Sequence, residues 1–450
     1  MMNKITTNYL ILGANASGLS AAVRILKSDK QAKITVLEKS DVVSFGSCGI
    51  PYYVAGEFDD INQMTARPLE DFIKLGIDVR LFHTAIGLDP LNKQVTAHNG
   101  NTNQSVSLAY DKLFIAVGAS PTTPPIKGLA AKNIHTMHSK ADAITILNLL
   151  PEIQHVVIIG AGFIGMEAAE AFSEQGKNVT VIEFAERVLA RTFDAEITPQ
   201  VEDALQRHSV ALQLNESVLE IKHENGAAHS VLTNKDEYPA DLVIVATGFK
   251  PNTEFLRNTD IKLSKEGAII IDDQCKTNLP DIYAAGDCAT VPHKISGNVY
   301  IPLATSANKL GRIAGDVMAG KDSRFIGTLG SSGVRVFDVE AGRTGITEEE
   351  AKQLGIDYGT VVIKDKNQTD YVPGQSDMWV KLIYEQQSRK LLGGQVCGRY
   401  LGGAVHRVDA LAVAVYSGLT VEELGFMDFI YAPPFARTWE ILNIAGNVAK

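Results

Sequence analysis

The 450-residue chain has few cysteines and no cysteine pair. Its four are Cys48, Cys275, Cys288 and Cys397, and none belongs to a CxxC motif. Zinc sites need Cys or His ligands at short, paired spacings, so the sequence predicts no metal centre. A chain of this length buries enough apolar surface to fold without a disulfide framework, which suits a reducing compartment such as the cytoplasm.

Long apolar runs and basic tracts are also missing. The apolar run that begins at His155 stops at Gly160, well short of the roughly 18 residues that a membrane span needs. Residues 1–7 contain no apolar segment of the signal-peptide type. The net charge of −10 is spread along the chain without a basic cluster, so no nucleic-acid surface is expected. These absences favour a cytoplasmic enzyme of two or three domains that binds neither nucleic acid nor membrane.

The strongest motif that is present lies at residues 155–165. An apolar strand runs into Gly160-x-Gly162-x-x-Gly165, and a helical pattern follows. Gly160 allows a tight turn, Gly162 lets the backbone approach a pyrophosphate, and Gly165 permits close packing of helix on strand. The next strand ends in Glu183, whose carboxylate suits the ribose 2′-hydroxyl of NAD and would repel the 2′-phosphate of NADP. The segment therefore predicts an NAD-binding unit.

The N-terminus repeats this plan. An apolar strand at 9–12 leads into a turn from Gly13 to Gly18, and the next strand again ends in an acid, Glu38. Asn15 stands where the second glycine would be, but asparagine still tolerates unusual backbone angles, and the order of strand, turn, helix, strand and acid supports the motif. The sequence thus predicts a second nucleotide-binding unit.

A second internal repeat supports the pairing of the two units. Segments 113–121 and 243–251 are each an apolar strand stopped by a glycine, Gly118 or Gly248, and then by proline. This punctuation is expected where the end of a strand meets a bound cofactor.

These pieces, in this order, resemble the flavin-dependent pyridine nucleotide–disulfide oxidoreductases over essentially the whole chain. A further match is segment 281–289, whose Gly286 and Asp287 stand where that family binds the flavin ribitol and pyrophosphate. The resemblance implies FAD and NADH as cofactors. It also implies an α/β fold with two Rossmann-like dinucleotide-binding domains, as in glutathione reductase, and a C-terminal α+β dimerisation domain. The expected domains are a split FAD domain at 1–120 and 245–324, an NAD domain at 121–244 and an interface domain at 325–450.

Within the last domain, the patterns predict strands near 334–337 and 379–384 and a helix at 409–416. A further helix is expected at 347–354, with Glu350 in a capping box.

The resemblance also implies the cofactor contacts. For FAD they are Gly13, Asn15, Ala16, Gly18, Glu38, Lys39, Ser44, Gly118, Gly286 and Asp287. For NADH they are Gly160, Gly162, Phe163, Ile164, Gly165, Glu167, Glu183 and Gly248. Phe163 stands where many relatives carry a tyrosine over the nicotinamide pocket, and Glu167 either faces the nicotinamide or is an ordinary acid on the helix surface.

The stretch 44–53, Ser-Phe-Gly-Ser-Cys-Gly-Ile-Pro-Tyr-Tyr, resembles the single-cysteine branch of the family. That branch contains NADH oxidases, NADH peroxidases, coenzyme A-disulfide reductases and persulfide or polysulfide reductases. A lone Cys48 has to cycle through a mixed disulfide or a sulfenic acid. Gly46 and Gly49 leave the backbone bare for a flat ring, and Pro51 suits the first turn of a helix whose positive end favours the reactive thiolate. The other three cysteines are expected to be buried and inert.

Departures within the branch favour a disulfide or persulfide reductase. Ala16 replaces the histidine of peroxidases and many water-forming oxidases, and the Gly-Ile-Pro-Tyr-Tyr after Cys48 matches the reductases. Arg24 and Arg67 lie where that branch lines its coenzyme A channel, and an arginine fork pairs well with phosphate. An ordinary solvated charge is an equally good interpretation of each arginine.

The C-terminal motif 429–435 resembles the segment that reaches the partner's active site across a homodimer. Its Tyr431 would donate a hydrogen bond to a leaving thiolate or a bound peroxide, or would be an interface aromatic. After Phe435 the chain departs from the Ser/His-rich continuation of coenzyme A-disulfide reductases, which leaves the acceptor open.

The function predicted from the sequence is electron transfer from NADH through FAD to Cys48, and on to a small disulfide or persulfide such as coenzyme A disulfide. One alternative is an NADH oxidase that reduces O₂ to water or hydrogen peroxide through a Cys48 sulfenic acid. An alternative of another class is a non-catalytic redox sensor that holds flavin.

Overall fold

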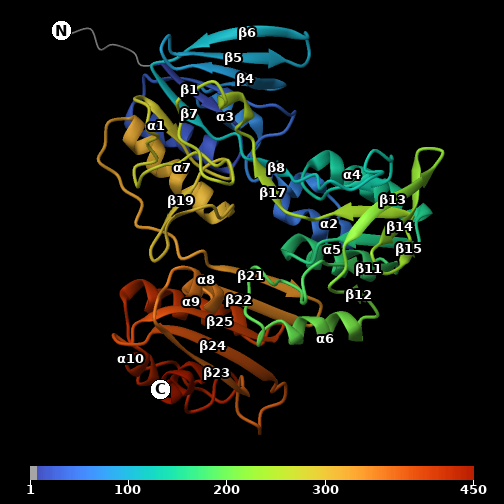
Figure 1. Ribbon diagram of the computed structural model, residues 1–450. Helices are drawn as coiled ribbons and strands as arrows, with labels where there is room; N and C mark the ends of the chain where they lie inside the picture. The colour runs from blue at the N-terminus through green and yellow to red at the C-terminus, as the bar shows by residue number, and fades with distance from the viewer. Residues whose placement is uncertain (1–7) are drawn as a thin grey trace. The chain divides into compact units, whose positions relative to one another are not determined.

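The computed structural model describes residues 8–450 (Figure 1). Residues 1–7, where we expected no signal segment, lie outside the described part. By their internal contacts, the residues form two compact units. The first runs to Gly49 and includes Asp60–Pro121 and Phe249–Thr328, and the second contains Ile50–Asp59, Thr122–Gly248 and Leu329–Lys450.

The first unit is built on a parallel five-stranded sheet in the order β18-β7-β1-β2-β3. These strands are Ile282–Ala284, Lys112–Ile115, Asn8–Leu12, Lys33–Leu37 and Asp78–Arg80. Continuous apolar runs bury the inner strands on both faces, as parallel sheets require. Helices α1 (Ala16–Ser28) and α7 (Ala304–Met318) pack closely together. Glycine at position 311 allows this approach, because a Cβ there would lie only 2.3 Å from the Ser17 carbonyl oxygen.

The second unit contains another parallel five-stranded sheet, in the order β12-β11-β10-β16-β9. Its strands are Ala211–Gln213, Asn178–Ile182, His155–Ile159, Leu242–Val245 and Ile134–His135. Helix α5 (Phe163–Glu174) follows β10 and packs on β10 and β11. Two further helices of this part are α4 (Lys140–Leu149) and α6 (Pro199–Arg207).

The two parallel sheets repeat each other. The central strands β1 and β10 have β2 or β11 on one side and β7 or β16 on the other. The first glycine of each turn makes the same bond, since Gly13 N donates to Leu37 O at 2.7 Å and Gly160 N donates to Ile182 O at 2.8 Å. This confirms the α/β class with two Rossmann-like units.

Each repeat also carries a three-stranded antiparallel sheet that the sequence analysis did not predict. The first consists of β4 (His83–Asp89), β5 (Gln94–Asn99) and β6 (Gln104–Ala109). The second consists of β13 (Val218–Glu224), β14 (Ala227–Thr233) and β15 (Glu237–Pro239). Both stand just before the fourth strand of their repeat, β7 or β16, so the duplication extends further than the motifs indicate.

The matching segments after β7 and β16 end in short strands that pair with each other. Strand β8 (Ala119–Pro121) forms an antiparallel ladder with β17 (Phe249–Pro251). The glycines that precede them, Gly118 and Gly248, adopt φ of +66° and +108°, which explains the glycine at each strand end.

The C-terminal part of the second unit is an antiparallel five-stranded sheet in the order β21-β22-β25-β24-β23 (Figure 1). The strands are Ser332–Val336, Val339–Gly345, Leu391–Arg399, Asp377–Glu385 and Tyr358–Lys366. Helix α9 (Ala404–Ser417) packs on β22 and β25, whereas α11 (Ile441–Val448) packs on β23, β24 and α10 (Val421–Gly425). The predicted strands and helices of this region are present, and the capping box of α8 (Glu348–Gln353), formed by Thr347 and Glu350, is confirmed.

Short elements complete the chain. They are the 3₁₀ helices at Ser47–Gly49, Ile61–Met64, Leu150–Glu152 and Glu254–Leu256, the helices α2 (Ile50–Ala55) and α3 (Leu69–Lys74), and the strands β19 (Val291–His293) and β20 (Gly297–Val299). Across residues 8–450, none of the helices combines the length and apolarity that crossing a bilayer requires.

Candidate redox site and nucleotide-binding turns

The N-terminal turn needs glycine at two positions. A Cβ on Gly13, whose φ is +107°, would lie 2.2 Å from the Ala116 carbonyl oxygen. A Cβ on Gly18 would lie 1.9 Å from the Gly13 carbonyl oxygen. Asn15 is extended, with φ of −113°, and precedes α1 as its N-cap. Any residue adopts this conformation, so the turn does not draw on the tolerance of asparagine for unusual backbone angles.

The acid at the end of β2 is held against this turn. Glu38 Oε2 accepts a hydrogen bond from Ala14 N at 2.9 Å, and Oε1 accepts bonds from Ser40 N at 2.9 Å and Ser40 Oγ at 2.8 Å. The carboxylate thus lies at the carboxyl edge of the sheet, where ribose hydroxyls are bound in this type of fold. Lys39 beside it is exposed, and Ala16 begins α1.

Several groups around the turn suit FAD. Ser17 is buried, and its Oγ has no hydrogen-bond partner within the described chain. Gly286, with φ of +80°, faces it, since a Cβ there would lie 3.2 Å from Ser17 Cβ. Burial raises the pKa of the neighbouring Asp287, which no charged side chain offsets. A buried hydroxyl without a partner and a desolvated carboxyl fit a polar ligand, so the residues are compatible with the pyrophosphate and ribitol of FAD.

Cys48 lies on a loop that is tied to the same turn. Ser44 adopts φ of +53°, and its N–H donates to the Ala14 carbonyl oxygen at 2.9 Å. Gly46 N donates to Met64 O at 2.8 Å, and a Cβ on Gly49 would meet the Met64 side chain at 3.2 Å. Cys48 itself is exposed, in the 3₁₀ helix Ser47–Gly49. The loop therefore holds an accessible thiol on the flavin-binding unit.

The other cysteines differ from Cys48 in burial. Cys275, Cys288 and Cys397 are buried thiols, as we expected. Burial raises the pKa of Cys275 far above its usual value, and it raises the pKa of Cys288 and of Cys397 to about 12. Thiols of this kind are poor nucleophiles, which leaves Cys48 as the exposed thiol among the four.

The two candidate arginines lie in the first unit with different partners. Arg24 Nε pairs with the buried Asp316 at 2.8 Å and is half-buried. Arg67 makes only a long contact with Asp71, at 3.7 Å, and its guanidinium lies 4.9 Å from the centre of the Phe72 ring. Arg67 also follows the segment Thr65–Ala66, which is bonded to the Cys48 loop through Phe45 and Ser44. Arg67 is thus the more available of the two cations.

The second turn requires glycine at the same two positions as the first. A Cβ on Gly160 would lie 2.6 Å from Ala246 O, and one on Gly165 would lie 1.9 Å from Gly160 O. At Gly162 the space is open, as an approaching pyrophosphate requires. Glu183 Oε2 accepts a bond from Ala161 N at 2.7 Å, the counterpart of the bond between Glu38 and Ala14.

Glu167 makes a contact that the sequence did not indicate. Phe163 and Ile164 begin α5, and the Phe163 ring packs edge-on against Phe193. One turn later, Glu167 Oε1 accepts a hydrogen bond from the Tyr52 hydroxyl at 3.3 Å. Burial raises the pKa of Glu167 to about 7, although the Tyr52 bond opposes the shift. Glu167 is therefore not an ordinary surface acid.

Tyr431 also has a partner that the sequence analysis missed. It is half exposed, and its hydroxyl is hydrogen-bonded to that of Tyr371, a bond that raises the pKa of Tyr371. The two loops are joined where Thr369 Oγ1 donates to Pro433 O at 2.9 Å. No sequence motif marks Tyr371, because it lies in an irregular loop about sixty positions before Tyr431.

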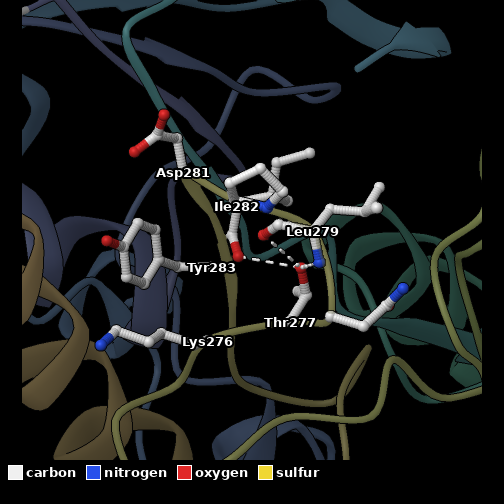
Figure 2. Close-up of a pocket in the computed structure, with 8 residues that line it drawn as sticks. Lys276, Thr277, Leu279, Asp281, Ile282 and Tyr283 are labelled. Carbon is white, nitrogen blue, oxygen red and sulfur yellow. Dashed lines mark hydrogen bonds between the residues drawn. The ribbon is translucent and has the colours of Figure 1, made fainter. Parts of the chain in front are cut away.

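A pocket of about 350 Å³ at residues 276–283 is not part of this site (Figure 2). Figure 2 shows the Thr277 hydroxyl bonded within the loop, donating to Ile282 O at 2.9 Å and accepting from Leu279 N at 3.1 Å. The pocket lies at the start of β18, whereas Gly286 and Asp287 follow its carboxyl end.

Among residues 8–450, one group of three acids has carboxylate oxygens within 4.8 Å of one another, namely Glu57, Glu170 and Glu174. Arg335 is ion-paired with Glu57 and, at 2.8 Å, with Glu170. The group is therefore an ion-pair network.

Comparison with known proteins agrees with this geometry. Residues 7–311 match the Pyridine nucleotide-disulphide oxidoreductase family, and residues 331–441 match its dimerisation domain. The chain is 39% identical to the NAD(P)H coenzyme A polysulfide/persulfide reductase of Pyrococcus horikoshii, with all of both chains covered. It is 34% identical to an NADH oxidase of Enterococcus faecalis, covering 98% of each. A solved NAD-dependent persulfide reductase from A. fulgidus superimposes with a TM-score of 0.94 at 35% identity, over 98% of this chain and 82% of that one.

Proposed function

Because the chain belongs to the pyridine nucleotide-disulphide oxidoreductase family, we propose that it carries electrons from NADH through FAD to Cys48 and on to a small disulfide or persulfide such as coenzyme A disulfide. One observation carries the proposal. The exposed Cys48 lies on a loop bonded to the FAD turn, whereas the other three cysteines are buried.

The chain supplies binding and positioning for this reaction. The N-termini of α1 and α5 and the two glycine turns receive the pyrophosphates of the two nucleotides, and Glu38 and Glu183 receive their ribose hydroxyls. A bound FAD would supply the redox chemistry, namely acceptance of a hydride from NADH and transfer of the electron pair to sulfur. The sulfur that receives it belongs to Cys48 in a mixed disulfide with a small thiol.

The cysteine then cycles. The electron pair breaks the S–S bond, the small thiol leaves with a proton, and Cys48 remains as a thiolate. The thiolate attacks the next disulfide, forms a new mixed disulfide and releases the second thiol. One NADH and one proton thus convert one disulfide to two thiols.

We also propose that Arg67, with Arg24 in support, binds the phosphates of a coenzyme A substrate. Arg67→Met should raise the KM for coenzyme A disulfide about tenfold, the loss of one charge-assisted contact, and should leave the KM for cystine, which has no phosphate, unchanged. Lys74→Met is the matched control, because Lys74 pairs with the same Asp71 at 3.6 Å. An equal rise in KM for both disulfides would contradict this assignment.

The dimerisation domain supports a homodimer. We propose that Tyr431, with Tyr371, reaches the active site of the other subunit. Exposed apolar side chains lie within five positions of Tyr431 in the sequence, including Phe426, Ile430 and Phe435. Burial of these groups between two copies would remove a large apolar surface from water. The domain boundaries given above and the cytoplasm, where thiols stay reduced, remain part of the proposal.

The second candidate is an NADH oxidase, which the Enterococcus faecalis relative favours. Ala16 lacks the side chain that would assist O–O cleavage, so we place this activity second. No finding supports a non-catalytic sensor.

The deciding experiment compares anaerobic NADH consumption with coenzyme A disulfide and oxygen uptake in air. Fast anaerobic turnover with slow oxygen uptake is expected. Cys48→Ser should keep FAD and its reduction by NADH but lose disulfide turnover, and Cys397→Ser is the buried control. Fast oxygen uptake without disulfide turnover would instead assign the oxidase.

A further inference from the structure

A cluster of polar side chains joins three elements of the second unit. Helix α2 contributes Tyr52, helix α5 contributes Glu167 and Glu170, and strand β21 contributes Arg335. The Tyr52 hydroxyl donates to Glu167 Oε1 at 3.3 Å. Burial raises the pKa of Tyr52, so its hydroxyl keeps its proton and remains a donor.

Arg335 fixes Tyr52 from the other side. Its guanidinium carbon lies 5.0 Å from the centre of the Tyr52 ring and 5.4 Å from that of Tyr400. Arg335 Nε lies 2.8 Å from Glu170 Oε1, and its other end is paired with Glu57. A cation held by two acids and two aromatic faces has little freedom to move, so Tyr52 is held in one place.

The groups around Glu167 shift its pKa in opposite directions. Burial and the charge of Glu170 raise its pKa, whereas the Tyr52 bond and the charge of Arg335 lower it, and the balance is about 7. The other charged groups on these elements are Glu57 after α2 and Glu174 at the end of α5. Helix α4, which packs on α2, has Lys140 and Asp142 at its start, and Asp142 caps its own helix.

The position of Glu167 relies on the proposed NADH site. The glycine turn at the start of α5 marks the pyrophosphate, and Glu183 on β11 marks the adenosine ribose. Helix α5 packs against both β11 and α2. Glu167 is bonded to Tyr52 on α2, whereas Glu183 stands at the end of β11, so we infer that Glu167 lies on the nicotinamide side.

We propose that Tyr52 and Arg335 are positioning residues that hold Glu167 beside the nicotinamide and keep it available as a carboxylate. When NADH gives up a hydride, its neutral dihydropyridine ring becomes a pyridinium cation. A desolvated carboxylate near the ring stabilises this developing charge, whereas a neutral carboxyl does so much less. The inference rests on the proposed function only in that NADH reduces the flavin.

The test is the pH profile of flavin reduction by NADH in the FAD-loaded enzyme, measured anaerobically by stopped-flow absorbance. The wild-type rate should rise with pH through one ionisation near 7. Tyr52→Phe removes a bond that favours the carboxylate, so the rise should move up by about one pH unit, and the rate below the rise should drop about tenfold. At high pH the variant should recover the wild-type rate. Glu167→Gln should show a low rate without this rise.

Proton release on binding of NAD⁺ gives a second readout that needs no turnover. Calorimetry at pH 6.5 in two buffers of different ionisation enthalpy should show proton release in the wild type. The release should disappear in Glu167→Gln and should be larger in Tyr52→Phe at pH 7.5, where more of its Glu167 is protonated. The matched control is Tyr238→Phe, which removes another Tyr–Glu bond, to Glu216 at 2.9 Å, and should leave both readouts unchanged.

A Tyr52→Phe profile that is unshifted, or lowered equally at every pH, would overturn the inference, since a merely structural role lowers the rate without moving the ionisation. If NADH does not reduce the flavin at all, the proposed function fails instead. Loss of disulfide turnover with a normal NADH step leaves this inference standing.

Discussion

Lys381 provides the sharpest test of the energetics of the second unit. It lies on β24, is 1% exposed, and has three carboxylates around its Nζ: Glu348 at 2.7 Å, Glu196 at 2.8 Å and Asp194 at 3.4 Å. Glu196 and Asp194 follow the nucleotide strand β11, whereas Lys381 and Glu348 belong to the C-terminal domain. The cation therefore joins the NAD-binding fold to the dimerisation domain.

Replacement of Lys381 by methionine keeps the volume of the side chain but leaves the acids without their shared cation. Breaking a buried ion pair in this way costs about 3–5 kcal/mol of unfolding free energy. The Lys381 bond is also the main reason that the pKa of Glu348 falls to about 2. At roughly 1.4 kcal/mol per pKa unit, and after discounting for the partial exposure of Glu348, this side chain accounts for about 2 kcal/mol of the total.

The depressed pKa fixes the direction of the pH effect. Because the carboxyl binds its proton less tightly in the folded state, the stabilisation is complete above its ordinary pKa and declines as the pH falls toward about 2. The difference between wild type and Lys381→Met should therefore shrink by about 1 kcal/mol between pH 6 and pH 3.5.

The assay is urea unfolding followed by circular dichroism at both pH values. Lys352→Met is the matched control, because the exposed Lys352 pairs with the same Glu348 at 3.2 Å and should have little effect. A Lys381→Met protein as stable as wild type, or one whose deficit does not change with pH, would refute the reasoning.

Two further predictions concern the nucleotide sites. Gly165→Ala places a methyl group 1.9 Å from Gly160 O. NADH should then no longer reduce the flavin, while absorbance spectra should show that FAD stays bound. Retained reduction of the flavin would mean that the turn can widen to accept the methyl group. Glu183→Gln removes the charge that repels a 2′-phosphate, so the ratio of kcat/KM for NADPH to that for NADH should rise about tenfold or more. An unchanged ratio would mean that Glu183 does not face the adenosine ribose.

The sequence predicted the parts of the fold that have strong local signals. Glycine turns, the apolar strands around them and the acids at the ends of β2 and β11 follow from local geometry, and the Thr347 capping box is itself a local signal. The sheet β4–β6 was not predicted because its apolar signal is weak: β6, Gln104–Ala109, has no buried residue.

The site was predictable where the backbone alone determines the residue. Gly13 is required by its contact with the Ala116 carbonyl and Gly18 by its contact with the Gly13 carbonyl, whereas the extended Asn15 could be replaced without backbone strain. The Tyr52–Glu167 pair was beyond sequence reasoning, because the two residues are 115 positions apart and meet only through the packing of α2 on α5.

The ends of the segment 122–248 lie next to each other, with Thr122 N donating to Gly248 O at 2.8 Å and β8 paired with β17 just outside them. A segment whose ends meet in this way can be inserted into a host domain with little entropy of loop closure. Two copies of one ancestral nucleotide-binding gene, one placed inside the other, would give this arrangement without disturbing the folding of either. The same junction marks where a segment of different cofactor preference could be exchanged, provided that it keeps Asp194 and Glu196 as partners of Lys381.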